Sequence, residues 1–366
     1  MQKISDDIRF GPMSPAVPLQ PVVDPAGWTK EELAATDEWI ERLSESEVAE
    51  LDAAIAALEA RGVSSVLEVA AGDYQLPTLG PRLERMNEDV LHGRGFVLIR
   101  GVPVARYTRL QSALAFWCIG RYFGQPVSQN AKGHLLGHVQ DLGGMSFKNP
   151  THRGYQTHDR LPYHSDSCDV VGLLCLHPSK SGGASMITSS IAIHNEMLKR
   201  RPDLVAALAE PIYRDRRGEV PEGKDPWFQL PVFNYYQGYL TTSWQGGYIR
   251  SAERFEELPK RSAALTEALD LFTDLANELT FGMDFQPGDI QLLHNHVMVH
   301  ARTDFEDWPE PERRRHLLRL WLATPDGGRP LPPVFRDRYG HLGPDDRPAG
   351  GIMVPGTKLK APLEAE

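Results

Sequence analysis

The chain has 366 residues, 41% of them hydrophobic, and a formal net charge of −10 at pH 7. A chain of this length and hydrophobic content can bury a sizeable core, and one large domain is the expected organisation. The negative charge argues against nucleic acid or an anionic membrane as the main partner. We therefore expect a globular protein that acts on a small molecule.

The N-terminal part is predicted to be an extended arm followed by helices. Residues 1–27 are rich in proline and lack the basic start and apolar core of a signal peptide. Residues 28–61 show helical periodicity, with a capping box at 44–47 and Gly62 as the stop. No apolar stretch in the sequence reaches the roughly 18 residues of a membrane span.

A strand is predicted at residues 96–100 and a helix at residues 110–121. The three cysteines, Cys118, Cys168 and Cys175, are an odd number without a C-x-x-C pattern. This usage is typical of reduced thiols, so we expect a cytoplasmic protein.

The triplet His164-Ser165-Asp166 is the first candidate metal-binding motif. It follows Leu161-Pro162-Tyr163, and the apolar residues 170–176 after it have the composition of a buried strand. A His and an Asp two residues apart on an extended segment point to the same side, so both can reach one ion. The alternative is a surface histidine beside a turn carboxylate.

A long insertion is predicted at residues 190–286, with helices at 191–200 and 263–278 around an aromatic-rich segment at 227–248. Three arginines within it are expected to be solvated loop charges: Arg214, Arg216 and Arg217.

The distal motif begins with a turn signal at residues 287–289 and continues into residues 290–299, which are apolar enough for a buried strand. His294, His296 and His300 share parity, so on one ideal strand they would face one side. One of them is needed as a ligand, and the others are expected to be hydrogen-bonded in the core. Asn295, Asp289 or a neighbouring histidine could support the ligands as hydrogen-bond partners.

Two neutral histidines and one carboxylate form the facial triad that binds Fe(II) and leaves coordination positions open. Arg315 and Arg319 follow the distal motif. The planar, permanently charged fork of arginine suits a carboxylate, because it can form two parallel charge-assisted hydrogen bonds.

Taken together and in this order, these motifs resemble the TauD/TfdA-like Fe(II)/2-oxoglutarate dioxygenases, and among them the clavaminate-synthase-like members. The resemblance extends from about residue 93 to 335 and is carried by residues 93–101, 164–166, 182–185, 288–291 and 300–302, and by Arg315 with Arg319.

The resemblance implies that His164, Asp166 and His300 bind Fe(II) and that Arg315 pairs with the distal carboxylate of 2-oxoglutarate. It places Ser185 near the co-substrate, and it places Arg319 in the same pocket, on co-substrate or substrate. With O2, the reaction would convert 2-oxoglutarate to succinate and CO2 while the substrate is oxidised. The carboxylate of Asp166 argues against a halogenase, because related halogenating enzymes carry a small residue there.

The fold implied by the resemblance mixes α and β structure, with a double-stranded β-helix (jelly-roll) core, flanking helices and the long insertion. We expect a single catalytic domain over 1–366. Its parts would be an arm and helices at 1–80, the core at 81–335 and a tail at 336–366.

The substrate is expected to be a small carboxylate or an amino-acid-like molecule, and hydroxylation is the expected outcome, with desaturation and oxidative cyclisation as alternatives. A homo-oligomer is compatible with the sequence. Two other classes stay open: a non-catalytic metal or small-molecule binding protein, and a zinc hydrolase using His294, His296 and His300, which would leave Arg315 unexplained. Candidate pocket residues are Asn130, His138, Gln140, Tyr235 and Trp244.

Overall fold

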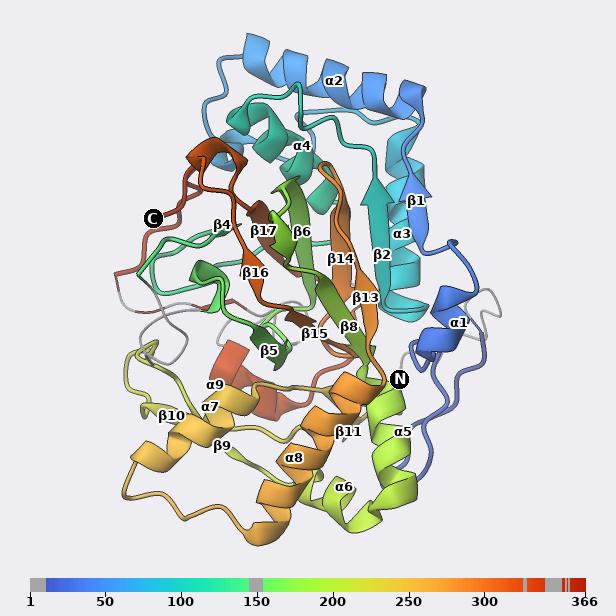
Figure 1. Ribbon diagram of the computed structural model, residues 1–366, viewed down its shortest axis with the longest axis vertical. Helices are drawn as coiled ribbons and strands as arrows, with labels where there is room; N and C mark the ends of the chain where they lie inside the picture. Colours follow the sequence, from blue (N-terminus) through green and yellow to red (C-terminus); the bar gives the residue numbers. More distant parts are fainter. Residues whose placement is uncertain (1–10, 145–153, 325–327, 340–350, 353, 355) are drawn as a thin grey trace.

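Two β-sheets form the centre of the computed structural model, which describes residues 11–144, 154–324, 328–339, 351–352, 354 and 356–366 (Figure 1). The larger sheet has seven strands: β1 (Ile40–Arg42), β2 (Phe96–Arg100), β3 (Gln125–Pro126), β4 (Leu136–Val139), β6 (Val170–His177), β14 (Ile290–His294) and β17 (His316–Ala323). Their order is β1-β2-β14-β6-β17-β3, and β4 also pairs with β17.

The smaller sheet has the order β13-β8-β15-β5 and is antiparallel throughout. Its strands are β5 (Leu161–His164), β8 (Ser185–Ser189), β13 (Phe281–Met283) and β15 (Met298–Arg302). The chain passes from the smaller to the larger sheet at residues 165–169, and from the larger to the smaller sheet at residues 295–297. This pair of sheets is the expected jelly-roll core.

Helices cover both sides of the core. On the outer face of the larger sheet pack α3 (Leu79–His92) and α4 (Arg109–Gly120), and α2 (Glu45–Ala60) packs on α4. On β17, Leu318, Leu320 and Leu322 pack against this helical layer, whereas Trp321 belongs to the cluster on the other face of the sheet. The alternation along β17 therefore turns Arg319 and Trp321 toward the smaller sheet.

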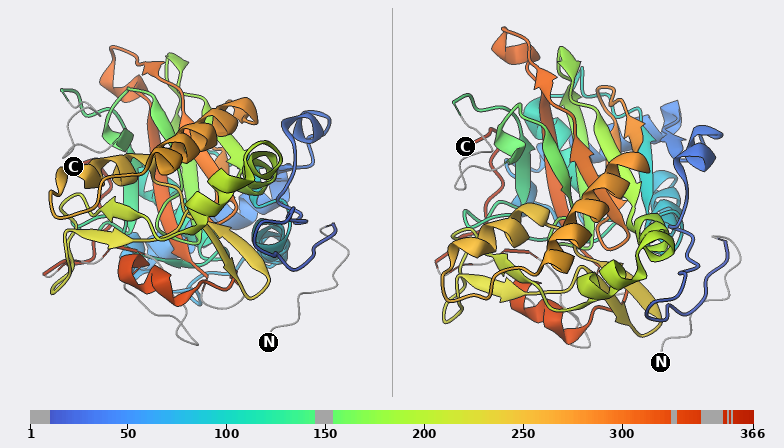
Figure 2. Two further views of the ribbon diagram at one scale, coloured as in Figure 1. Left: turned by 90° about the horizontal axis from the view of Figure 1, so that it is seen from below. Right: turned by 60° about the horizontal axis from the view of Figure 1, so that its bottom comes forward.

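The insertion forms a layer at the opposite end of the molecule, below the strands in Figure 1 and in front of them in the right-hand view of Figure 2. The predicted helices are confirmed as α5 (Ser190–Arg200) and α8 (Ala263–Glu278). The other elements are α6 (Pro202–Ala209), α7 (Gly246–Ser251), β9 (Tyr213–Asp215), β10 (Trp227–Gln229), β11 (Phe233–Tyr236) and β12 (Tyr239–Thr242). Outside it lie α1 (Lys30–Ala34), β7 (Ser181–Gly182), β16 (Phe305–Glu306) and α9 (Arg336–Tyr339).

The helical structure predicted over residues 28–61 is interrupted by β1, and that part of the prediction is wrong. β1 pairs in parallel with β2, so backbone pairing in the sheet overrides local helical periodicity. The capping box is confirmed at the start of α2, where the Ser44 and Glu47 side chains each accept the other's backbone N–H.

The single strand predicted over residues 290–299 is two strands, β14 and β15, in different sheets. The chain turns at Asn295, whose backbone N–H donates to the carbonyl of Asp169 at 2.8 Å. The three distal histidines therefore do not share one strand face, and the parity argument fails for them.

The turn before β14 requires a glycine. Gly288 has φ +87°, and a Cβ there would lie 1.9 Å from the carbonyl oxygen of Val102. Asp289 next to it is fully buried and accepts two hydrogen bonds from Arg100, at 2.8 and 2.7 Å. Asp289 therefore anchors the strand β2 rather than a metal-binding histidine.

Arg214 and Arg216 are buried, so their prediction as solvated charges is wrong. Arg214 is 0% and Arg216 1% exposed. The Arg214 guanidinium donates to the backbone carbonyls of Leu230, Pro231 and Ser243. These bonds hold the insertion together, and burial lowers the pKa of Arg214 to about 9. Arg217 is half-exposed.

All three cysteines are buried and unpaired. Within the part of the chain that the structure describes, no helix is both long and apolar enough to cross a membrane.

Candidate metal and co-substrate site

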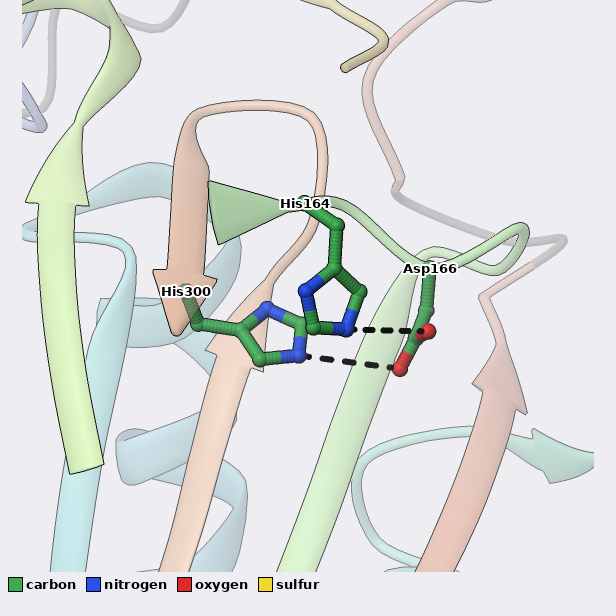
Figure 3. Close-up of side chains that lie close together, drawn as sticks. All are labelled: His164, Asp166 and His300. Carbon is green, nitrogen blue, oxygen red and sulfur yellow. Dashed lines mark ion pairs between the residues drawn. The ribbon is translucent and has the colours of Figure 1, made fainter. Parts of the chain in front are cut away.

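His164, Asp166 and His300 converge at the inner face of the smaller sheet (Figure 3). One ligand atom from each lies within 4.8 Å of the others. The Nε2 atoms of His164 and His300 are each 3.8 Å from a different carboxylate oxygen of Asp166. These separations are too long for hydrogen bonds but suit three ligands of one ion.

Strand pairing positions the two histidines. His300 on β15 lies directly opposite His164 on β5, and their ring centroids are 4.2 Å apart. Asp166 lies beyond the end of β5, in the connection to β6, and not on an extended strand with His164 as predicted. Its backbone N–H donates to Asn295 Oδ1 at 3.0 Å, so the two connections between the sheets hold the carboxylate in place.

The protonation of these residues suits a divalent metal. His164 Nδ1 lies 2.9 Å from the carbonyl oxygen of Pro162, which fixes the proton on Nδ1 and leaves Nε2 free to bind. Burial lowers the pKa of His300 to about 3, so its ring is neutral. Burial alone would raise the pKa of Asp166, but the charge of Arg319 and the hydrogen bond from Trp321 help to hold it below its ordinary value.

Two neutral imidazoles and an ionised carboxylate are the donor set that Fe(II) prefers in a facial triad. Nε2 of each histidine faces one oxygen of Asp166, and one ligand atom of each residue lies within 4.8 Å of the others, so the residues present fit Fe(II).

Trp321 orients the carboxylate. Its indole Nε1–H donates to Asp166 Oδ2 at 2.9 Å from the inner face of β17. Replacing Trp321 by phenylalanine keeps an aromatic side chain but removes this donor, and we expect Fe(II) affinity to fall about 10- to 100-fold. Anaerobic Fe(II) titration measures the change. Trp117→Phe is the matched control, because Trp117 Nε1 donates to Val69 O in the core against the helices. Equal Fe(II) affinity in both variants would contradict this role.

The remaining distal histidines are structural. His296 Nε2 lies 2.9 Å from Asp169 Oδ1, and the His296 backbone N–H donates to His294 Nδ1 at 3.3 Å. These bonds tie together the two connections between the sheets. Among the described residues, His164, Asp166 and His300 form the one group that could hold a metal. A zinc site of His294, His296 and His300 is thus not formed.

A cavity next to the candidate metal ligands has the chemistry of a dicarboxylate site. It is lined by His164, His300, Ser185, Arg302, Arg315 and Arg319, among others. Ser185 is buried on β8, and its hydroxyl donates to Gln291 Oε1 at 3.1 Å.

Arg315 lies immediately before β17 and is 4% exposed. Its Nη2 is 3.5 Å from the carbonyl oxygen of Gly183, and its Nη1 has no partner among the described residues. Gly183 has φ +73°, and a Cβ there would lie 3.1 Å from Arg315 Nε, so glycine makes room for the guanidinium. Burial lowers the pKa of Arg315 to about 10, which leaves it charged at neutral pH. An unpaired buried cation fits an anionic co-substrate. Arg313 and Arg314 are exposed.

Arg319 lies between this cavity and a larger one. Its Nε donates to Gln129 Oε1 at 2.7 Å, and its Nη1 is 4.0 Å from Asp166 Oδ2. The guanidinium carbon lies 4.6 Å from the Tyr155 ring centroid and 5.3 Å from that of Trp321. It is therefore held rigidly next to the Asp166 carboxylate.

The larger of the two cavities that His164 lines, called the larger cavity below, has a volume of about 160 Å³ and opens on His164 and Asp166. Asn130 lines it, and so does Tyr248 at the end of the aromatic segment. The other lining residues with charged or polar side chains include Tyr155, Gln129, Arg217, Glu219, Gln245 and Arg338.

The other predicted pocket residues lie elsewhere. His138 and Gln140 line a neighbouring cavity, and His138 Nδ1 is 2.7 Å from His316 Nε2. Tyr235 and Trp244 do not line the larger cavity. The hydroxyl of Tyr235 is 2.7 Å from His194 Nε2, and Trp244 stacks in the core on Phe272, with ring centroids 3.9 Å apart.

Three functional candidates were not predicted from the sequence: Trp321, Gln129 and Arg302. The period of two along β17 could have placed Trp321 on the same face as Arg319. Arg302 is two residues after His300, so the same period along β15 could have placed Arg302 on the face of His300. Gln129 contacts Arg319 across 190 residues of sequence, which no local pattern reveals.

Comparison with protein families gives a match to "Taurine catabolism dioxygenase TauD, TfdA family" over residues 60–321. An FR-33289 synthase of Streptomyces rubellomurinus is 30% identical over 323 residues, covering 86% of this chain and 93% of that protein. The taurine hydroxylase-like protein SAT17 of Stachybotrys chartarum is 31% identical, covering 85% and 82%. A uridine-5'-phosphate dioxygenase of Amycolatopsis is 27% identical, covering 63% and 85%.

Solved structures share the fold. Asparagine oxygenase with Fe(II), 3-hydroxyasparagine and succinate aligns with a TM-score of 0.64 at 17% identity, covering 87% of this chain and all of that one. The non-haem iron oxygenase OrfP with iron and α-ketoglutaric acid aligns with a TM-score of 0.57 at 14% identity, covering 77% and 93%.

Proposed function

The chain belongs to the TauD/TfdA family of Fe(II)- and 2-oxoglutarate-dependent oxygenases, and on this premise we propose that it hydroxylates a small anionic or amino-acid-like molecule. The observation that carries the proposal is the convergence of two histidines and one carboxylate beside a cavity lined by Arg302 and Arg315, each of which has an Nη1 without a partner among the described residues. A protein that only binds a small molecule needs neither an open metal site nor an anchor for a co-substrate.

In this proposal, His164, Asp166 and His300 hold Fe(II), and Arg315 pairs with the distal carboxylate of 2-oxoglutarate while Ser185 lies beside it. When bound, Fe(II) with 2-oxoglutarate and O2 supplies the oxidising chemistry, which yields succinate and CO2 and oxidises the substrate. Trp321 keeps the Asp166 carboxylate turned toward the metal.

The substrate would occupy the larger cavity. Arg319 supplies positive charge where this cavity meets the co-substrate cavity, and Tyr248 with the start of α7 forms part of its wall. A wall built from the long insertion also shields the oxidising centre from water. Substrate recognition by charge agrees with the relatives, one of which is named for uridine 5'-phosphate and another for its likeness to taurine hydroxylase.

Desaturation or oxidative cyclisation would use the same residues, and product analysis by mass spectrometry separates them: hydroxylation adds one oxygen atom, and the other two remove two hydrogens.

A cytoplasmic location is part of the proposal, supported by the three buried, unpaired thiols.

The substrate proposal predicts a charge preference. Small carboxylates and amino acids should stimulate succinate formation, and their methyl esters or amides should stimulate it much less, because a neutral group cannot pair with Arg319. Succinate formation is measured with each compound and compared with the amount formed when no compound is added. Equal stimulation by charged and neutral members of each pair would contradict charge recognition.

A further inference from the structure

Arg302 lies in the co-substrate cavity but has been given no role so far. It is two residues after His300 on β15, so both side chains leave the strand on the same side. On the neighbouring strand β8 its direct partner is Ser185. Arg302 and Arg315 line the same cavity. The fold therefore places a further arginine, besides Arg315 and Arg319, beside the site proposed for 2-oxoglutarate.

The contacts of Arg302 fix it in place but leave one nitrogen unused. Its Nη2 donates to the carbonyl oxygen of Thr157 at 2.9 Å and to that of Asp159, and its Nε donates to Thr303 O at 3.3 Å. The side chain is 5% exposed. Its Nη1 has no hydrogen-bond partner among the residues that the structure describes. Leaving a buried N–H group of a cation unpaired is costly, so this nitrogen points to a missing acceptor.

Arg315 also has one guanidinium nitrogen that makes no hydrogen bond to the described residues. This nitrogen is Nη1, and it is buried. The guanidinium carbons of Arg302 and Arg315 lie 4.8 and 5.2 Å from the centroid of the same Phe305 ring. Among the described residues, no carboxylate forms an ion pair with either arginine. Both arginines line one cavity, and burial together with the charge of Arg315 lowers the pKa of Arg302. An anion in this cavity would reduce the repulsion between them and could supply both missing acceptors.

We infer that Arg302 and Arg315 together hold the distal carboxylate of 2-oxoglutarate, each donating its unused Nη1–H to that group. The inference rests on the proposed function and adds a second residue that binds the co-substrate carboxylate. A carboxylate has two oxygens and about four acceptor sites, so it can accept from two guanidinium groups at once. The backbone contacts of Arg302 hold this donor ready before the co-substrate arrives.

The test compares two 2-oxo acids of equal chain length, 2-oxoglutarate and 2-oxopentanoate, which lacks the distal carboxylate. Their dissociation constants are measured anaerobically by calorimetry on the Fe(II)-loaded protein, without turnover. In Arg302→Gln the affinity for 2-oxoglutarate should fall about 10- to 100-fold, while that for 2-oxopentanoate should stay within about twofold. Arg314→Gln is the matched control, because Arg314 is the exposed arginine next to Arg315.

Arg302→Lys is the second variant, and melting curves are recorded for Arg302→Gln and Arg302→Lys to show that each is folded. Lysine keeps the charge but cannot reproduce the planar fork, so this variant should also lower the ratio of the two affinities. The inference is overturned if a folded variant keeps the wild-type ratio of 2-oxoglutarate affinity to 2-oxopentanoate affinity. It is also overturned if the variant binds both 2-oxo acids more weakly by the same factor. A wild-type protein that binds no 2-oxoglutarate would instead overturn the proposed function.

Discussion

Replacing His300 by alanine should abolish Fe(II) binding at micromolar protein, and His164→Ala and Asp166→Ala should do the same. The site has three protein ligands, and one ligand atom from each lies within 4.8 Å of the others. Loss of an outer hydrogen-bond partner already costs roughly 10- to 100-fold in metal affinity, so loss of a ligand should cost more. Anaerobic titration with Fe(II), monitored by calorimetry, measures the loss of Fe(II) affinity.

The controls are His294→Ala and His296→Ala. Both residues are buried, and their hydrogen bonds support the connections between the sheets, so these variants should melt at lower temperatures but still bind Fe(II). Normal Fe(II) binding by His300→Ala, together with lost binding in a folded His294 or His296 variant, would show that the ligands are assigned to the wrong residues.

Replacing Arg315 by leucine should raise the dissociation constant for 2-oxoglutarate by orders of magnitude. Removing one partner of a buried charge pair leaves the other uncompensated and costs about 3–5 kcal/mol. Arg315 is 4% exposed, so solvent offers the carboxylate little compensation. The dissociation constant of the Fe(II)-loaded variant, measured without O2, is the readout.

Arg314→Leu is the control for this prediction. Arg314 is exposed, and its Nη2 contacts the carbonyl oxygen of Pro309 at 3.4 Å in the loop before β17. Its loss should leave 2-oxoglutarate affinity unchanged. Weak binding by Arg314→Leu with normal binding by Arg315→Leu would place the anchor one residue earlier.

The sequence predicted the elements that have strong local signals. The capping box at Ser44 begins α2, and the helical periodicity at 263–278 appears as α8, because these features depend on neighbours in the chain. The jelly-roll was predicted from the resemblance of the motifs and not from periodicity. The strand β1 was missed, since it is only three residues long and exists through its pairing with β2.

The candidate site was predicted only in part, because contacts between distant segments of the chain also determine it. The spacing of His164 and Asp166 suggested one strand face, whereas Asp166 is held in a connection by Asn295 and Trp321, which are 129 and 155 residues away. Arg214 was expected in solvent because arginine in a loop usually is, but three backbone carbonyls of the insertion surround it. Contacts between distant segments decide both cases, and a single sequence does not report them.

Release of labelled CO2 from carbon 1 of 2-oxoglutarate, with Fe(II) and O2, tests the central claim most directly. The wild-type protein should release CO2 and form succinate in equal amounts, release should stop when Fe(II) is removed with a chelator, and adding Fe(II) back should restore it. Asp166→Ala, folded as judged by its melting curve, should release none above the protein-free control. CO2 release by Asp166→Ala at the wild-type rate, or release by the wild type that continues without Fe(II), would contradict the account.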